Sequence, residues 1–188
     1  VWQFQGWNLA YNVCVEWDLV ADRYFWVKEG IKFLKKGVEW NRKFPEIYWY
    51  TGDTYGKKVG RADEWVQFRR FFKNDPNKER FPSGLDPEIN PGGEDNYLVA
   101  KKWFIQANEI ELSGHAQHIM ARVLFRSYPA RAQLDYAGTL QKEGLFDETT
   151  RLAWELGYKN WAEEYGREMF PSDIEGINEI RLENTPEE

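Results

Sequence analysis

Apolar residues recur at helical spacing through most of the chain, and small residues interrupt them at intervals. Over residues 21–41 one side is apolar or small, and the other side is basic. The apolar stripe comprises Trp26, Gly30, Phe33, Leu34, Gly37 and Val38, and the lysines are Lys28, Lys32, Lys35 and Lys36. A period of 3.6 residues is typical of a helix with one face on a core. Glycine in that face allows a close backbone approach. The sequence therefore predicts an all-α fold, in which Lys28 lies on the solvent-exposed face of its helix.

The same periodicity predicts further helices and one long interruption. Besides 21–41, helices are expected over 4–17, 97–112, 115–128, 130–144 and 146–166, and on both sides of a turn near Gly60. Pro129 is expected to open a new helix pair, and Asp147 to cap the helix that follows it. Residues 73–96 contain four prolines and three glycines and show no periodicity. We therefore predict a long irregular loop there, of a length that is uncommon in compact domains unless it is functional or disordered.

Composition and charge indicate one core and an acidic end. Hydrophobic residues make up 42% of the 188 residues, which is ample for a single domain. We expect one helical domain over 1–170, with the 73–96 insertion inside it, and an acidic tail over 171–188. The tail carries six carboxylates and one arginine, so it holds most of the net charge of −6. This charge argues against a nucleic-acid partner, because phosphate binding needs a basic surface.

Two segments carry small and large residues at the positions of a helix-pair repeat. Counted from Pro45, positions 4, 8, 11 and 32 are Tyr48, Gly52, Tyr55 and Pro76. Counted from Ala130, positions 8, 11, 15 and 24 are Ala137, Leu140, Gly144 and Ala153. This pattern resembles the tetratricopeptide repeat (TPR), a unit of about 34 residues in two antiparallel helices. Most of the chain outside the loop also resembles poorly characterised TPR-containing proteins of planctomycete bacteria.

The resemblance implies an α-solenoid fragment of antiparallel helix pairs that binds other proteins. In TPR arrays the first helix of each pair lines a concave groove. The matching positions predict partner contacts, which are Trp49, Asp53, Lys57, Arg131, Gln141 and Lys142. Trp49 has two readings that the sequence leaves open, an aromatic anchor for a partner or a ring packed under a neighbouring helix. Trp49 and Asp53 replace the lysine and asparagine of carboxylate-clamp TPRs, so no such clamp is expected.

Candidate chemistry is sparse. His115 and His118 lie three apart on a predicted helix, but they are the only histidines and lack further ligands, so we predict no metal site. Cys14 lies in an apolar stripe and is expected to be a buried structural thiol. In the segment from Phe68 to Lys73 the phenylalanines are expected in the core, beside solvated or snorkelling arginines. No nucleotide, hydrolase or haem motif is found, so no catalytic residue and no cofactor is predicted.

The resulting functional prediction is a non-enzymatic scaffold, a TPR-like subunit that organises a larger multi-subunit complex. The alternative is a non-catalytic accessory domain of a larger exported or membrane-associated enzyme, and a helical metal protein using the two histidines ranks third. The expected partners are other protein subunits and a second copy of the chain. No apolar run approaches the ~18 residues of a membrane span. Because the chain starts at Val1, next to a predicted helix and not with a methionine, we interpret it as a processed chain or excised fragment. The resemblance suggests a bacterial protein, and its compartment stays open.

Overall fold

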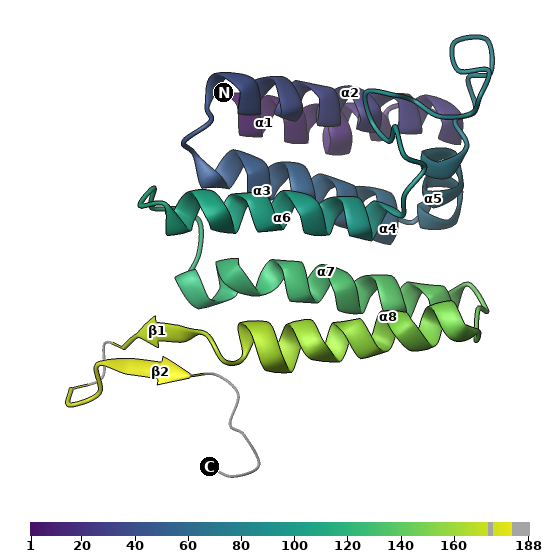
Figure 1. Ribbon diagram of the computed structural model, residues 1–188. Coiled ribbons are helices and arrows are strands. Elements are labelled where there is room, and N and C mark those ends of the chain that lie inside the picture. Colours follow the sequence, from purple (N-terminus) through teal and green to yellow (C-terminus); the bar gives the residue numbers. More distant parts are fainter. Residues whose placement is uncertain (173–174, 182–188) are drawn as a thin grey trace. The chain divides into compact units, whose positions relative to one another are not determined.

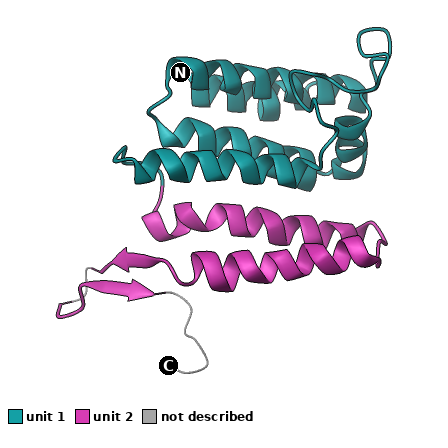
Figure 2. Cartoon of the chain, in the orientation of Figure 1, with its two compact units in different colours: residues 1–119 teal, residues 120–188 magenta. Residues whose placement is uncertain are grey.

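A computed structural model of the chain, which describes residues 1–172 and 175–181, confirms the all-α fold (Figure 1). The chain forms two compact units, 1–119 and 120–188, whereas the sequence prediction placed one domain over 1–170 (Figure 2). The helices of the first unit are α1 (Trp2–Trp7), π-helical η1 (Asn8–Val13), α2 (Val20–Trp40), α3 (Pro45–Asp53), π-helical η2 (Thr54–Lys58), α4 (Val59–Arg61), α5 (Trp65–Lys73) and α6 (Asn96–Leu112).

The most extensive helix pairings of the first unit are antiparallel, α1–η1 with α2 and α3 with α6, and α2 also packs against α3 (Figure 1). The pairing of α3 with α6 differs from the prediction, which joined α3 to the helix directly after the turn near Gly60. That helix, α5, is short and packs against α2 and α4 instead. The long helix that packs against α3 is α6, which follows the loop in the sequence. Phe104 and the Ala100 carbonyl oxygen of α6 lie next to Gly52 of α3.

Glycines lie where these helices cross most closely, as predicted. A Cβ at Gly30 would lie 2.6 Å from the carbonyl oxygen of Gly6 and 2.9 Å from the backbone nitrogen of Ala10. A Cβ at Gly52 would lie 2.9 Å from the ring of Phe104. Real Cβ atoms are not found this close, so each crossing depends on the missing side chain.

The second unit contains α7 (Arg122–Lys142), α8 (Glu148–Tyr158), π-helical η3 (Lys159–Tyr165), and the strands β1 (Met169–Pro171) and β2 (Glu179–Arg181). The predicted break at Pro129 is wrong, because α7 runs through it. Side chains link the turns on either side of the proline. Ser127 donates to the Leu124 carbonyl (2.6 Å), and Arg131 donates to the Ser127 hydroxyl (2.8 Å).

Two predicted features between the helices of the second unit are confirmed, the glycine after the first helix and the N-cap of the second. Gly144 has φ +82° just after α7, a conformation that suits glycine. The Asp147 carboxylate accepts a hydrogen bond from the Thr150 N–H (3.2 Å) and caps α8. The strands were not predicted. They pair antiparallel with Phe170 opposite Ile180, so the segment predicted as an acidic tail begins with a hairpin. Residues 173–174 and 182–188 of that predicted tail lie outside the described residues.

We predict that Gly30→Ala lowers the free energy of unfolding by about 1–3 kcal/mol, because the added methyl group meets backbone atoms of the facing helix. Gly56→Ala is the matched control. Its Cβ would lie 3.6 Å from the Ala100 Cβ, an ordinary contact, and alanine favours helix. Urea unfolding of both variants provides the comparison. Equal stabilities would contradict the close crossing.

Candidate functional site

The predicted partner residues of the first unit form one cluster on α3 and η2. The ammonium of Lys57 lies 2.8 Å from the Asp53 carboxylate and 5.6 Å from the centre of the Trp49 ring. Trp49 itself is only 6% exposed, and its ring lies 6.1 Å from the Phe104 ring on α6. Of the two readings of Trp49, packing under a neighbouring helix therefore holds. Lys57 is the exposed member of the cluster, and its contact with a partner stays a prediction.

The pKa of the Asp53 carboxyl depends on its burial and on the neighbouring cations. Burial raises the pKa of its carboxyl above the ordinary range, while the ion pair with Lys57 and the charge of Arg61 act in the opposite direction. The folded state therefore binds the proton of Asp53 more tightly than the unfolded state does. It follows that ionisation of Asp53 weakens the fold as pH rises past the ordinary carboxyl pKa.

The predicted partner residues of the second unit do not form one cluster. The guanidinium of Arg131 lies 5.6 Å from the centre of the Trp161 ring and donates to Ser127. Gln141 and Lys142 are exposed in the last turn of α7. At 1.5 Å per residue they lie roughly 15 Å farther along the helix than Arg131. Whether these side chains bind a partner stays a prediction.

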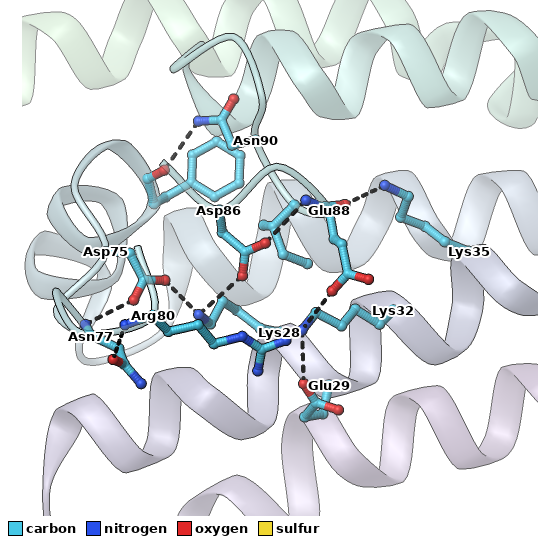
Figure 3. Close-up of polar contacts among 12 residues, drawn as sticks. Lys28, Glu29, Lys32, Lys35, Asp75, Asn77, Arg80, Asp86, Glu88 and Asn90 are labelled. Carbon is cyan, nitrogen blue, oxygen red and sulfur yellow. Dashed lines mark hydrogen bonds and ion pairs between the residues drawn. The ribbon is translucent and has the colours of Figure 1, made fainter. Parts of the chain in front are cut away.

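The most strongly built polar site centres on Lys28, and here the sequence prediction is wrong. Lys28 is only 5% exposed, although its position in the helical repeat predicted the solvent-exposed face of α2. Its ammonium lies 2.5 Å from Asp75 Oδ2 and 3.1 Å from Asp86 Oδ2, and both aspartates belong to the predicted loop (Figure 3). The ammonium also lies 4.6 Å from the centre of the Phe81 ring. We call Lys28, Asp75 and Asp86 the lysine clamp.

Each aspartate of the lysine clamp uses its two oxygens differently. Asp75 Oδ1 accepts from the Asn77 N–H (2.9 Å), and Asp86 Oδ1 accepts from the Glu88 N–H (3.0 Å), while both Oδ2 atoms bind Lys28 (Figure 3). Both aspartates precede a proline. Aspartate commonly bonds the backbone two residues on in such turns. The repeated Asp-Pro pair was the sequence signal that could have found the clamp.

Further buried bonds hold the end of the same segment. The Asn90 side chain donates to the Phe72 carbonyl (3.0 Å), and the Tyr55 hydroxyl donates to the Ile89 carbonyl (3.0 Å). Arg69, 2% exposed, binds Asp95 at 2.8 Å, so the expected solvation of this arginine is wrong. Phe68 and Phe72 are buried as predicted. The 73–96 segment is therefore an ordered part of the first unit.

A cleft of about 230 Å³ lies between α2 and the first part of this segment. Its lining mixes charged and aromatic side chains, namely Ala21, Asp22, Tyr24, Phe25, Lys28, Lys32, Asp75, Pro76, Asn77, Arg80 and Phe81. Burial, with the charges of Asp75 and Asp86, raises the pKa of the Tyr24 hydroxyl. The Lys28 ammonium is already paired with the carboxylates of Asp75 and Asp86. The volume of the cleft is also below the ~300–1,000 Å³ of typical ligand pockets. The cleft is thus part of the loop anchor.

The two histidines do not lie on a helix, contrary to the prediction. Gly114, with φ +97°, ends α6, and α7 begins only at Arg122. The His118 N–H donates to the Glu46 carboxylate (3.1 Å). Within residues 1–172 and 175–181, no group of three or more His, Cys, Asp or Glu residues is placed to hold a metal ion. Cys14 is 1% exposed, as predicted, and burial raises its pKa.

Comparisons with family models, with curated proteins and with solved structures found no match to this chain. Among the helices of the described residues, none is both long and apolar enough to cross a membrane.

We predict that Lys28→Met lowers the free energy of unfolding by about 3–5 kcal/mol, because it leaves two buried carboxylates without their cation. The matched control is Lys32→Met. Lys32 binds Glu29 (3.1 Å) and the exposed Glu88 (3.0 Å), so its loss is expected to cost less than about 1 kcal/mol. Hydrogen exchange should also accelerate over 75–90 in Lys28→Met alone. Unchanged protection there would argue against the clamp.

We predict that Lys57→Met raises the pKa of Asp53 further, because the lysine cation favours the ionised carboxylate. A carbon-13 NMR titration of the Asp53 carboxyl measures the shift. Lys102→Met is the control, since Lys102 pairs with Glu94 instead. A pKa that stays constant or falls in Lys57→Met would show that the ion pair is not formed.

Proposed function

We propose that this chain is a TPR-like interaction module, a non-catalytic subunit that organises a larger protein assembly. The proposal rests on helices in antiparallel pairs with glycine at close crossings, and on the surface of α8. It assigns partner binding to helical faces rather than to the segment held by the lysine clamp. That segment is anchored inside its own unit by buried bonds.

The observation that carries the proposal is that α8 exposes apolar side chains on both sides of its buried stripe. Thr150, Ala153 and Gly157 form the buried stripe. Leu152 and Leu156, 49% and 43% exposed, follow one edge, and Trp154 and Tyr158, 38% and 68% exposed, follow the other. An amphipathic surface helix normally carries polar residues at these positions. A helix that packs against neighbours on both sides, as in a solenoid or a subunit interface, is expected to carry apolar ones.

Polar groups on α8 fit the same interpretation. Arg151 pairs with Glu148 (2.7 Å) and Glu155 (2.8 Å), and all three side chains are more than half exposed. These charges lie opposite the buried stripe, so they keep the remaining surface solvated. The apolar edges and the charged ridge thus divide the exposed surface of α8 into a part that suits protein contact and a part that suits water.

We expect Leu156→Glu to weaken binding of partner subunits at least about tenfold, because a carboxylate would be buried in an apolar contact. The affinity-tagged chain is isolated from its own host, and the bound subunits are quantified by mass spectrometry. Gln141→Glu is the contrasting variant, because it places the same side chain on the exposed end of α7, in the groove that the TPR resemblance predicted. If the predicted groove is the contact, Gln141→Glu is the variant that loses partners.

Identical recovery of partner subunits by the wild type and Leu156→Glu would remove α8 from the interface. Isolation of the wild-type chain without any stoichiometric protein partner would contradict the proposed function itself. Both substituted side chains are exposed, so the helices are expected to remain folded in both variants. Circular dichroism of each variant checks this.

A further inference from the structure

The irregular segment between α5 and α6 carries a closed, exposed loop. Residues 76–80, 82 and 83 are exposed, and the stretch forms neither helix nor strand. A backbone hydrogen bond from the Asp75 N–H to the Gly84 carbonyl (2.7 Å) closes the base of this loop. In Figure 1 the loop projects away from the helices. We call residues 76–83 the tip.

The chain is held by buried contacts on both sides of the tip. Asp75 precedes the tip and Asp86 follows it, and both bind the Lys28 ammonium of α2. Among the tip residues only Phe81 is buried, and its ring lies 4.6 Å from the same ammonium. One lysine therefore holds both ends of the tip in place, while residues 76–80 remain exposed.

The peptide bond after Lys78 is the one in the tip that is most open to an endoprotease with a preference for basic residues. Lys78 and Glu79, on its two sides, are both exposed. Arg80 is the other basic residue of the tip, but its following bond leads to the buried Phe81. Exposed loop tips with polar residues are preferred sites of proteolytic nicking. Bonds inside the helices are cut only after the helix has opened.

A cut after Lys78 would leave many buried contacts between the two pieces. The helix α3 lies in the piece 1–78 and packs against α6, which lies in the piece 79–188. Buried polar contacts also cross the cut, and they include Lys28 with Asp86 (3.1 Å), Tyr55 with Ile89 (3.0 Å), Phe72 with Asn90 (3.0 Å) and Arg69 with Asp95 (2.8 Å). The fold of the first unit therefore does not depend on the covalent link at the tip.

We propose that the tip is a proteolytic processing site, cut between Lys78 and Glu79 by an endoprotease of trypsin-like specificity, and that the cut chain stays folded. Hydrolysis adds one water molecule across this amide bond and leaves a carboxylate on Lys78 and an amino group on Glu79. Both new charges arise at exposed residues, so neither is buried. The lysine clamp and the pairing of α3 with α6 then hold the two pieces together.

Limited digestion of the folded chain with trypsin tests this inference. The first products are expected to be residues 1–78 and 79–188, identified by their intact masses. The pair should elute as one species in size-exclusion chromatography, with the helical circular dichroism of the uncut chain, and should separate in denaturant. Cleavage through global unfolding would instead expose the bonds after all 25 Lys and Arg residues, so no single pair would accumulate.

Lys78→Gln is expected to lose this pair of fragments, because the specificity pocket of trypsin requires a cation before the cut bond. The matched control is Lys43→Gln, since Lys43 is exposed in the turn between α2 and α3. This variant should be cut after Lys78 like the wild type. A first cut at another bond, or the same pair of fragments from Lys78→Gln, would overturn the site. Fragments that separate without denaturant would overturn the claim that the cut chain stays folded.

Discussion

The buried ammonium of Lys28 between Asp75 and Asp86 is the interaction on which the first unit depends. It joins α2 to a segment that has no helical or strand periodicity of its own. The three charges can be buried because each carboxylate oxygen accepts a hydrogen bond. Oδ1 of each aspartate accepts from a backbone N–H, and Oδ2 of each accepts from the Lys28 ammonium. The segment therefore has one defined path from α5 to α6, which allows α6 to pack against α3.

The helices could be predicted from the sequence because apolar periodicity is local information. The same holds for Gly144 and Asp147, whose roles depend on neighbouring residues. Lys28 could not be placed in this way, since its partners are 47 and 58 residues away and its helical phase indicated solvent. The pairing of α3 with α6 was missed for the same reason. Pro129 was misjudged because its side-chain neighbours Ser127 and Arg131 bridge the turn that the proline weakens.

The candidate interaction surfaces differ from those that the TPR resemblance indicated. Trp49, the aromatic residue of the predicted groove, packs under α6. Large apolar side chains are exposed instead along the edges of α8 and on α1, where Phe4 and Trp7 are exposed. The repeat pattern assigned residues to helix faces by analogy, whereas burial depends on which helices become neighbours. We therefore infer an interaction module whose binding surfaces are outer helix faces, supported in the first unit by the lysine clamp.

The native mass of the assembly isolated with this chain tests the interaction module most directly. Native mass spectrometry of the tagged chain, released gently from its host, measures that mass and the identity of each subunit. We expect a complex that contains the 22.4 kDa chain together with other proteins. A single chain of 22.4 kDa, with no other subunit at any concentration, would contradict it.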